Sequence, residues 1–457
     1  MKILNLKHKE IITAFINGEV IVGVYGLGKM GLPLAAVFAD RGAKIIGVDV
    51  SPQVVSMINN GDCPIAGEPG LAELVKFNVK ELRLRATTDG ENAVKESDVH
   101  VIIVPSLLDE NYNPQLTMVT DVCSVIASGL SKGDLVILET TVPPRTTIEI
   151  ILPILQQSGL KDGDFGLAYC PERTSSGRAI SDISGAYPKI IGGIDKRSTE
   201  VAVAIYSVIN KKGTRAVSNT TTAEAIKVFE GIYRDTNIAL SNELALVCRE
   251  IGINPAEVFK LANEPINAAT GHPYTNFLQP GAGVGGHCIP VYPYFITKNV
   301  SANTSLIQTA RKINESMPTY VVNLIIEGLN EIERSVKGSN ILLLGLTYRG
   351  GVKEVRYSPT IPIIKKLKRL QASVSLYDPM FSMKEIESYG VSYHDNKDYR
   401  NIDCVVVLSD HREFYNLDWL NAEKEMRSQV IVDGRQVIDP NHVQKLGFLY
   451  KGIGNIA

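Results

Sequence analysis

The sequence predicts an α/β protein with two doubly wound parallel-sheet domains joined by a central helical domain that contains a long helix. Two runs of alternating strand-like and helix-like segments, with a long amphipathic segment between them, support this prediction. The chain has 457 residues, of which 44% are hydrophobic and 21% are charged. At roughly 150 residues per domain, this length suits three domains with their own cores. We expect their bounds to be 1–205, 206–335 and 336–457.

The first alternating run begins with β-branched residues at 20–25, followed by glycines, a helical pattern and a second apolar run at 44–48. This strand–helix–strand order is typical of a parallel sheet. Further strands are expected at 99–104, 135–138 and 165–169. Roughly the first 200 residues are therefore predicted to form one parallel sheet.

The middle of the chain carries a long amphipathic segment. Thr221 and Glu224 have the spacing of a capping box, and apolar residues then recur every three or four residues up to Ile251. A helix over 222–251 would be about 45 Å long, which is more than a small domain needs. We expect it to bridge domains or subunits, and the protein to be a homodimer or a larger homo-oligomer.

The alternating pattern restarts near Ser339 and predicts a second sheet domain. It resembles the first in architecture, although the sequence shows no residue-level repeat. The expected strands are 340–346, 373–377, 404–408 and 430–432, with a helix around 361–370.

Composition and charge exclude several classes of function. The chain has 47 basic and 49 acidic residues, for a net charge of −2, so nucleic acid is not an expected partner. The six cysteines are far apart without zinc-ligand spacing, which favours reduced thiols, a cytoplasmic location and no metal. Because charged residues are mixed with the apolar ones at the N-terminus, no export signal is expected there, and the uncharged stretch 265–297 is interrupted by five prolines and five glycines. No membrane-spanning segment is expected.

The glycine motif after the first strand predicts an NAD site. It runs Gly26-Leu27-Gly28-Lys29-Met30-Gly31, directly after a strand and at the start of a helix, and Asp49 closes the next strand. In such a Rossmann-like unit, the glycines let a pyrophosphate approach the helix N-terminus. The Asp49 carboxylate would bind the adenosine ribose and repel a 2′-phosphate, which favours NAD over NADP.

A second glycine-rich segment, residues 280–288, ends in a candidate nucleophile. Its glycines would let the backbone pass close to a ligand, and Cys288 stands at its end. His287 is interpreted as structural, because neighbouring side chains of an extended chain point in different directions. The other five cysteines are expected to be small buried hydrophobes. Lys227, Arg234 and Asn237 are polar residues within the apolar pattern of the long helix. The ordinary explanation of such residues is a helix face that is exposed to solvent.

Motifs distributed along nearly the whole chain resemble those of the UDP-glucose/GDP-mannose dehydrogenase family. They are GLGKMGLPLA from Gly26, ETTVPP from Glu139, YCPER from Tyr169, AEAIKVFEGIYRDTNIALSNE from Ala223, GGHC ending at Cys288, GLTYRGGVKEVRYSP from Gly345, YDP from Tyr377, SDHREF from Ser409 and VDGRQV from Val432.

The resemblance implies a four-electron oxidation of C6 of a nucleotide sugar to a carboxylate with two NAD. Cys288 matches the nucleophile, which carries a thiohemiacetal and then a thioester, and Lys227 matches the lysine that stabilises the oxyanion. Thr141 and Glu172 match residues that hold or activate the catalytic water, and Thr141 also belongs to the implied NAD site. The implied nucleotide-sugar ligands are Glu172, Arg173, Lys227, Arg234, Asn237, Gly285, Tyr348, Arg349 and Arg356, with Asp378 in the same C-terminal domain.

Three positions depart from the family pattern. Gly231 replaces an Asn four residues after the lysine, Tyr292 replaces an Asp four residues after the cysteine, and Ser176 replaces a Glu. The lost Asn side chain would open volume near the sugar, or it would reflect closer helix packing.

The YRD and NIALSNE stretches, together with GGHC, resemble the subgroup acting on UDP-N-acetylmannosamine or UDP-N-acetylglucosamine, whose products feed polysaccharide biosynthesis. The sequence does not choose between these two epimers. The alternatives are a UDP-glucose 6-dehydrogenase, a two-electron hydroxyacid dehydrogenase and a catalytically silent nucleotide-sugar binder. NADH release with candidate UDP-sugars separates them.

Overall fold

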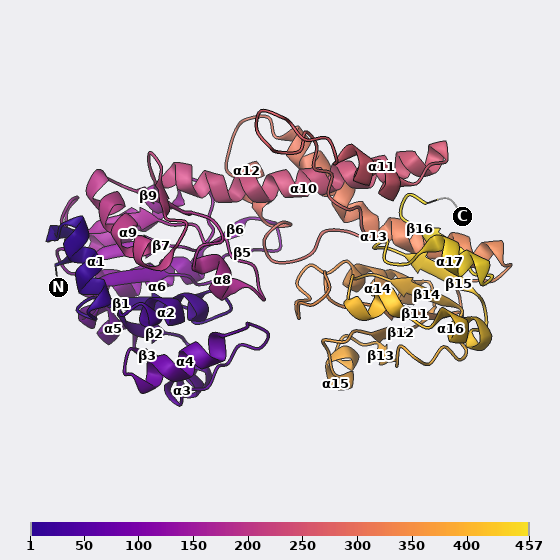
Figure 1. Cartoon of the computed structure of the whole chain (residues 1–457), viewed down its shortest axis with the longest axis horizontal. Helices are drawn as coiled ribbons and strands as arrows, with labels where there is room; N and C mark the ends of the chain where they lie inside the picture. The colour runs from indigo at the N-terminus through magenta and orange to yellow at the C-terminus, as the bar shows by residue number, and fades with distance from the viewer. Residues whose placement is uncertain (1, 456–457) are drawn as a thin grey trace. The chain divides into compact units, whose positions relative to one another are not determined.

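The computed structural model describes residues 2–455 and divides into two compact units. One unit comprises Met1–Glu230 with Tyr294–Val300, and the other comprises Gly231–Pro293 with Ser301–Ala457. The division falls within helix α10 (Thr220–Ile251), which starts two residues before the predicted bound (Figure 1).

The first unit contains an eight-stranded sheet in the order β10-β9-β8-β7-β4-β1-β2-β3. The chain starts in the middle at β1, adds β2 and β3 on one side, and then adds β4, β7 and β8 on the other, as the doubly wound prediction requires. β9 is antiparallel to β8, so the sheet departs from the expected parallel arrangement at this edge. The strands are β1 Ile21–Tyr25, β2 Lys44–Val48, β3 Leu84–Thr87, β4 Val99–Ile102, β7 Leu135–Leu138, β8 Gly166–Tyr169, β9 Lys189–Gly193 and β10 Thr214–Ala216.

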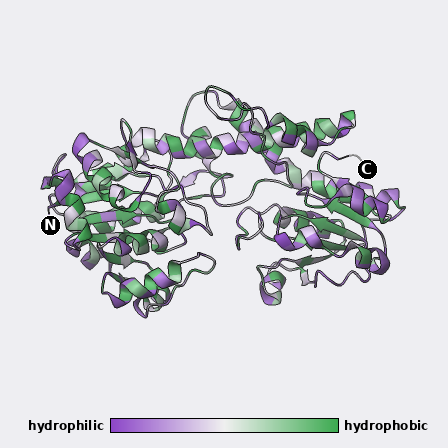
Figure 2. Ribbon diagram, viewed as in Figure 1, coloured by the Kyte–Doolittle hydropathy of each residue, from purple (hydrophilic) through white to green (hydrophobic). Residues whose placement is uncertain are grey.

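Helices cover both faces of this sheet. The strands are predominantly hydrophobic in Figure 2, as expected of a sheet buried on two sides. One face packs against α1 (His8–Ile16), α2 (Gly31–Asp40), α3 (Pro52–Asn59), α4 (Leu71–Lys80) and α9 (Lys196–Ile209). The other packs against α5 (Gly90–Glu96), α6 (Thr117–Gly129) and α7 (Leu152–Leu155).

The second unit contains a six-stranded parallel sheet in the order β13-β12-β11-β14-β15-β16. Helices α13 (Ser305–Glu331) and α14 (Thr360–Arg369) cover one face, and α16 (Trp419–Glu425) and α17 (Pro440–Lys445) cover the other. The strands are β11 Asn340–Leu344, β12 Ser373–Tyr377, β13 Ser392–Tyr393, β14 Cys404–Val407, β15 Val430–Asp433 and β16 Leu449–Gly452.

Within the second unit, α10 packs on α13 through a buried polar seam. Arg311 donates to the Asp235 carboxylate over 2.7 Å, and Asn314 Nδ2 donates to the same oxygen over 2.9 Å. Asn242 Nδ2 donates to Asn314 Oδ1 over 2.9 Å. These bonds give each buried side chain of the seam at least one polar partner, and they fix the register of the two helices.

The two sheets share a residue-level repeat at their carboxyl edges, contrary to the sequence expectation. The Gly26 N–H donates to the Val48 carbonyl oxygen, and the Gly345 N–H donates to the Tyr377 carbonyl oxygen, both over 2.8 Å. Both glycines have a positive φ, 100° at Gly26 and 109° at Gly345. The next residue in each case donates its N–H to a carboxylate that follows the second strand, Asp49 or Asp378.

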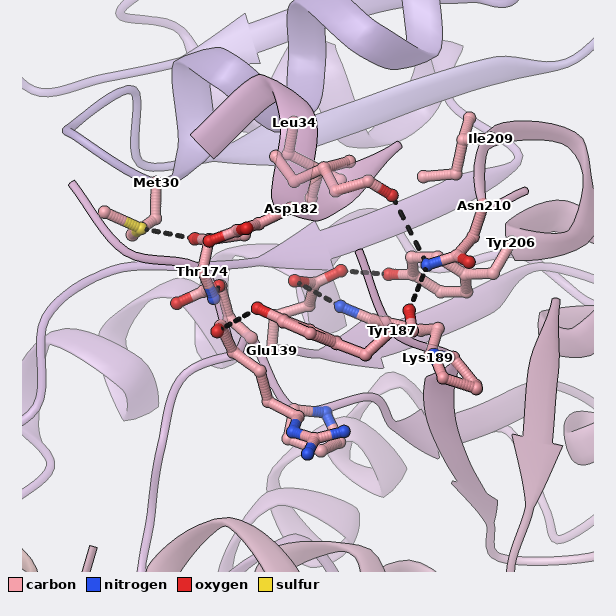
Figure 3. Close-up of a pocket in the computed structure, with 15 residues that line it drawn as sticks. Met30, Leu34, Glu139, Thr174, Asp182, Tyr187, Lys189, Tyr206, Ile209 and Asn210 are labelled. Carbon is pink, nitrogen blue, oxygen red and sulfur yellow. Dashed lines mark hydrogen bonds and ion pairs between the residues drawn. The ribbon is translucent and has the colours of Figure 1, made fainter. Parts of the chain in front are cut away.

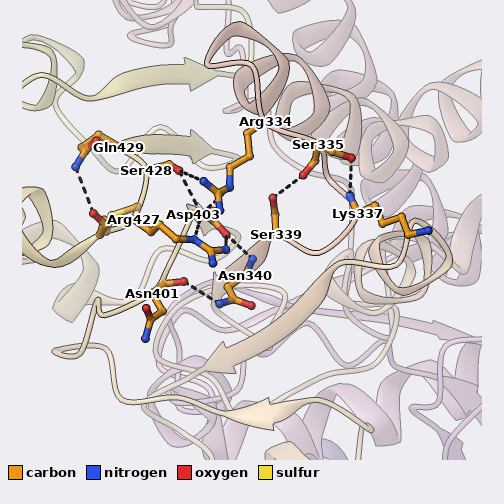
Figure 4. A network of polar contacts seen from close by, with 11 residues as sticks. Arg334, Ser335, Lys337, Ser339, Asn340, Asn401, Asp403, Arg427, Ser428 and Gln429 are labelled. Carbon is orange, nitrogen blue, oxygen red and sulfur yellow. Dashed lines mark hydrogen bonds and ion pairs between the residues drawn. The ribbon is translucent and has the colours of Figure 1, made fainter.

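The amino edges repeat as well. Asp98 accepts from the Ile21 N–H over 2.9 Å, and Asp403 accepts from the Asn340 N–H over 2.7 Å. Asp403 is fully buried and also binds two arginines, Arg334 and Arg427 (Figure 4). This network anchors the edge of the second sheet opposite to the one where ligands of such sheets bind.

Candidate functional site

The candidate site residues fall into two groups, one in each unit. The glycine motif of the first unit has the local geometry that a dinucleotide needs. A Cβ at Gly31 would lie 1.8 Å from the Gly26 carbonyl oxygen, so the turn closes tightly only with glycine there. A Cβ at Gly28 would meet nothing within 4 Å, which leaves room above the backbone where a pyrophosphate would approach the start of α2.

Asp49 is held at the end of β2 by two backbone N–H groups. Oδ2 accepts from Leu27 and Oδ1 accepts from Ser51, each over 2.9 Å, and the side chain is half-buried. These contacts aim the carboxylate along the carboxyl edge of the sheet, where a ribose would lie. The geometry fits NAD.

The segment that carries Glu172 contacts the glycine motif. The Thr174 hydroxyl lies 2.8 Å from Met30 Sδ, and the Thr174 N–H donates to the Glu172 carboxylate (Figure 3). Arg173 forms a two-point ion pair with Glu230 over 2.6 and 3.2 Å. Its guanidinium lies over the ring of Tyr187, 4.8 Å from the centroid. Glu172 is thus fixed beside the expected cofactor site.

Behind this segment lies a cavity with a buried ion pair. Lys189 Nζ lies 2.9 Å from Glu139, and the Tyr206 hydroxyl donates to the same carboxylate (Figure 3). The cavity is also lined by Met30 and Glu172. The sequence motif ETTVPP includes Glu139, but its partner Lys189 lies on β9, a strand that the sequence did not predict. The pair therefore ties β9 to the end of β7.

Thr141 stands three residues beyond β7, at the carboxyl edge of the sheet. Its carbonyl oxygen accepts from the Ser106 hydroxyl over 2.5 Å, which ties the segment to the chain after β4. A few residues later the chain meets α10 at Glu224. This carboxylate accepts from the Arg145 N–H over 2.6 Å and from the Thr147 N–H over 2.8 Å. Because Lys227 follows Glu224 by three residues on α10, the same contact positions Lys227.

Ser176 lies in a loop that is held by a carboxylate from another part of the chain. Glu68 accepts from the N–H of Gly177 and, over 3.0 Å, from the N–H of Ala179 at the start of α8 (Ala179–Ile183). Sequence reasoning missed Glu68, because it lies in a loop outside the recognised motifs. Its bonds to the backbone assign it a structural task.

The Cys288 loop belongs to the second unit. Gly281 donates to Asn242 Oδ1 over 2.9 Å, and Gly286 donates to the Arg356 carbonyl over 2.8 Å. Gly283 and Gly286 have φ values of 143° and 88°, which favour glycine. The Cys288 thiol at the end of this loop is partly exposed.

Tyr348 packs on the same loop. A Cβ at Gly285 would lie 2.3 Å from the Tyr348 Cβ, and a Cβ at Gly286 would lie 3.1 Å from the ring. Burial raises the pKa of the Tyr348 phenol, and the groups whose charges act on this pKa are Arg349, Cys288, Glu354 and Arg234. Several predicted site residues therefore lie near Tyr348 in the second unit: Gly285, on which it packs, and Arg234, Cys288 and Arg349, whose charges act on it. Arg356 joins this group through its carbonyl oxygen, which accepts the Gly286 N–H.

His287 contradicts the expectation that its side chain points away from Cys288. The two side chains are hydrogen bonded, and this bond, assisted by the Cys288 and Glu354 charges, raises the pKa of His287. His287 Nδ1 lies 4.0 Å from Glu354 Oε2. The rule for neighbouring residues failed because the loop here is a glycine-rich turn and not an extended strand.

The two departures at Gly231 and Tyr292 are one packing feature. A Cβ at Gly231 would lie 2.1 Å from Tyr292 Cδ2, and Tyr292 is 5% exposed. The ring fills the space that a larger side chain at 231 would need. Gly231 therefore opens no volume for a sugar, and the packing alternative is the correct one.

Asn237 uses both ends of its amide on the chain before the Cys288 loop. Its Nδ2 donates to the Asn276 carbonyl and its Oδ1 accepts from the Leu278 N–H, each over 2.9 Å. These contacts give Asn237 a structural task in addition to the predicted ligand role, which stays a prediction.

Within residues 2–455, no group of three or more His, Cys, Asp or Glu side chains could hold a metal ion, and no helix is long and apolar enough to cross a membrane. No disulfide joins the six cysteines in this part of the chain. Cys63 and Cys288 are partly exposed, and the others are buried.

A dinucleotide-type sheet with a fitted NAD motif, and a second such sheet beside a cysteine loop, define an NAD-dependent dehydrogenase with a second ligand domain. The sequence matches three domains described for the UDP-glucose/GDP-mannose dehydrogenase family. They are the NAD binding domain over residues 20–210, the central domain over 221–316 and the UDP binding domain over 342–440.

Relatives match over almost their full length. A UDP-N-acetyl-D-mannosamine dehydrogenase from Methanococcus vannielii is 36% identical over 441 residues, covering 95% of this chain and 97% of the relative. The structure of UDP-D-ManNAc dehydrogenase from Pyrococcus horikoshii is 34% identical, with a TM-score of 0.87 over 95% of this chain and 99% of that one. An NDP-N-acetyl-D-galactosaminuronic acid dehydrogenase structure from Methanosarcina mazei is 32% identical, with a TM-score of 0.84 over 98% of each chain.

The chain belongs to the UDP-glucose/GDP-mannose dehydrogenase family. It is an NAD-dependent enzyme, and the family's UDP binding domain implies a UDP-sugar substrate.

Proposed function

We propose that the protein oxidises C6 of a UDP-N-acetylhexosamine to the uronate. Within this class, UDP-N-acetylmannosamine is the proposed substrate. The observation that carries this proposal is the packing of the Cys288 loop on Tyr348, a residue of the region matched as UDP binding. This packing supports the proposal, because it brings the loop that carries the partly exposed Cys288 into contact with one of the expected nucleotide-sugar ligands. The names of the M. vannielii and P. horikoshii relatives support the acetamido substrate.

The cofactor is expected at Gly26, Gly28, Lys29, Met30, Gly31, Asp49 and Thr141. Bound NAD would accept a hydride from C6 in each of the two oxidations. Asp49 orients the ribose, and the backbone at Gly28 faces the pyrophosphate. Glu172, fixed beside Met30, is proposed to bind the reacting hydroxyl or water as a hydrogen-bond acceptor and to take up its proton.

Cys288 is proposed to hold the substrate between the two oxidations. The first oxidation removes a hydride and a proton from the C6 alcohol and gives an aldehyde. The thiol adds to the aldehyde carbon, and the resulting thiohemiacetal loses a second hydride and proton to become a thioester. Water then attacks the thioester carbon, which releases the carboxylate and returns the thiol. Thr141 and Glu172 would hold this water.

Two further side chains, one a cation and one a base, support the chemistry in this proposal. Lys227 would stabilise the oxyanion at C6, as a positioned cation does in a site shielded from water. His287, hydrogen bonded to Cys288, would take up the thiol proton when the sulfur attacks.

The nucleotide sugar would be bound by the residues around Tyr348. Arg349 and Arg356 offer guanidinium groups, which suit a pyrophosphate. Arg173, Arg234, Asn237 and Gly285 complete the proposed set. We propose the domain bounds 1–205 for NAD binding, 206–335 for the central catalytic and dimerisation domain and 336–457 for UDP-sugar binding.

A homodimer or larger homo-oligomer is part of the proposal. Within the second unit, α10 exposes large hydrophobic side chains at Tyr233, Leu240, Val247 and Ile251, with exposed fractions between 47% and 62%. Their spacing of seven, seven and four residues puts them on one helix face. A second copy of the chain would bury this face.

The test of the substrate is NADH release with UDP-N-acetylmannosamine, UDP-N-acetylglucosamine and UDP-glucose. We expect kcat/KM for the mannosamine substrate to exceed that for UDP-glucose at least tenfold, which corresponds to about 1.4 kcal/mol of transition-state discrimination. A preference for UDP-glucose would reject the substrate assignment. Cys288→Ser should abolish steady-state uronate formation, because an alkoxide ester forms and hydrolyses less readily than a thioester.

A further inference from the structure

His411 forms a buried junction at the carboxyl edge of the second sheet. It follows β14 and is 1% exposed on its side chain. Its Nε2 lies 3.1 Å from Asp378 Oδ2 and 2.8 Å from the Thr347 hydroxyl. Its Nδ1 accepts the Gly351 N–H over 3.2 Å. Because a backbone N–H can only donate, Nδ1 carries no proton, and the ring is the neutral tautomer with the proton on Nε2.

The residue before His411 holds the same loop. Asp410 Oδ1 accepts the Gly350 N–H over 2.7 Å, and its carboxylate lies 3.3 Å from Arg435. A Cβ at Gly350 would lie 2.2 Å from the Asp410 carbonyl oxygen, so the two segments touch backbone to backbone. Asp410 and His411 thus bind the N–H groups of the consecutive residues Gly350 and Gly351.

A third side chain, that of Asp378 directly after β12, holds the start of the same loop. Its Oδ2 accepts the N–H groups of Leu346 over 2.7 Å and Thr347 over 3.0 Å. In the first sheet the matching carboxylate, Asp49, belongs to a residue that is only partly buried. In the second sheet Asp378 is fully buried and bound to His411. The carboxylate after the second strand therefore binds the loop 346–351 in the second sheet, whereas in the first sheet it is expected to bind a ligand.

The clamped loop, residues 346–351, carries Tyr348 and Arg349. Tyr348 packs on Gly285 and Gly286, three and two residues before Cys288. The place of Tyr348 depends on the backbone of this loop, which the Asp378, Asp410 and His411 side chains hold at both ends. A displacement at Gly351 would therefore be passed to the Cys288 loop.

We propose that His411 is a positioning residue for the nucleotide-sugar site, which it orders through the bond from the Gly351 N–H to its unprotonated Nδ1. It contacts neither substrate nor cofactor and acts through Tyr348 and Arg349. This inference rests on the proposed function, because it takes Tyr348 and Arg349 as ligands of the UDP-sugar.

Two conservative substitutions separate the two ring nitrogens. The amide of His411→Asn reaches the place of Nδ1 and can still accept the Gly351 N–H. The amide of His411→Gln reaches the place of Nε2 and can still donate to Asp378, but it leaves Gly351 without its acceptor. His442→Asn is the matched control, since His442 is an exposed residue of α17 in the same sheet domain.

Binding is measured by titration calorimetry with UDP-N-acetylmannosamine and no NAD, so no turnover is needed. We expect His411→Gln to weaken binding at least tenfold, and His411→Asn and His442→Asn to stay within threefold of the unsubstituted protein. In steady state, His411→Gln should raise KM for the UDP-sugar and leave KM for NAD unchanged. Equal binding by the Asn and Gln variants, whether strong or weak, would overturn the proposal.

A second measurement does not depend on the variants' folding. In the unsubstituted protein with ¹⁵N-labelled histidine, His411 should show an unprotonated Nδ1 and a protonated Nε2. Observation of the opposite tautomer, or of a doubly protonated ring at neutral pH, would also overturn the proposed role of His411. If the unsubstituted protein binds no UDP-sugar at all, the proposed function is wrong. If it binds a UDP-sugar but His411→Asn and His411→Gln bind equally well, only the proposed role of His411 is wrong.

Discussion

Gly231 and Tyr292 show how two unusual residues can compensate each other. The ring of the buried Tyr292 occupies the space where any side chain at 231 would begin. Each residue alone departs from the family pattern, and together they form an ordinary packed contact between α10 and the start of α12 (Tyr292–Thr297). The loss of the family Asn is therefore tied to the gain of a tyrosine, and it does not open space for a larger sugar.

We expect Gly231→Ala to destabilise the protein by about 1–3 kcal/mol, the usual cost of overpacking. At an open helix position the same change would stabilise by up to about 1 kcal/mol, so the sign is diagnostic. Urea unfolding measures this change in the free energy of unfolding. The control is the same substitution in a Tyr292→Ala protein, where Gly231→Ala should no longer destabilise. A stabilising Gly231→Ala in the unsubstituted protein would refute the contact.

Asp49 is the residue on which the preference for NAD depends. Asp49→Ala should raise KM for NAD at least tenfold and reduce the ratio of kcat/KM for NAD over NADP, because the carboxylate both binds the ribose and repels a 2′-phosphate. Initial rates with each cofactor check this, with Asp62→Ala, an exposed aspartate of the same unit, as control. An unchanged cofactor ratio would place the ribose elsewhere.

The start of α10 is the element that ties the Thr141 segment to Lys227, and its key residue is Glu224. Burial raises the pKa of Glu224 to about 7, against the hydrogen bonds from Thr147 and Arg145 that favour the carboxylate. The folded protein therefore binds this proton more tightly than the unfolded chain does. The stability that Glu224 contributes is complete below pH 4.5 and is lost as pH rises through 7.

Glu224→Gln removes this titration. The free energy of unfolding of the unsubstituted protein, minus that of the variant, should fall by at most about 3 kcal/mol between pH 5 and pH 8. Asp235, whose pKa burial raises to about 6, shifts stability in the same direction but cancels in the difference. Urea unfolding at several pH values checks this, and a difference that grows with pH would contradict the assignment.

At the level of elements, the sequence predicted β1, β2, β4, β7, β8, β11, β12, β14 and β15 close to their bounds, and it did not predict β3, β9, β10, β13 and β16. β1, β2, β4, β7, β11 and β14 are nearly continuous buried apolar runs, which single-sequence patterns detect. β9 contains two glycines, and β10 and β13 have only three and two residues, so pairing with neighbours and not composition makes them strands.

The candidate site shows the same limit. Cys288 and the glycine motif were visible because their residue types are informative on their own. The His287–Cys288 bond, the Gly231–Tyr292 contact and the repeat of Asp49 in Asp378 were not, because each depends on how separate segments or turns pack.

For the whole molecule, the exposed hydrophobic face of α10 predicts self-association. Light scattering at micromolar concentration should give the mass of a dimer or a larger assembly. Leu240→Glu should weaken the assembly by putting a charge on this face, whereas Glu387→Ala, at an exposed position of α15 (Met383–Glu387), should not. A monomeric mass for the unsubstituted protein would remove this part of the proposal.

The central claim is that one chain carries out both oxidations, with Cys288 holding the substrate between them. The most direct measurement is the number of NADH formed per UDP-N-acetylmannosamine consumed, with the product identified by mass spectrometry. Two NADH per sugar and a uronate, with neither produced in steady state by Cys288→Ser, are the results that we predict. One NADH per sugar with release of a free aldehyde, or full turnover by Cys288→Ser, would contradict the account.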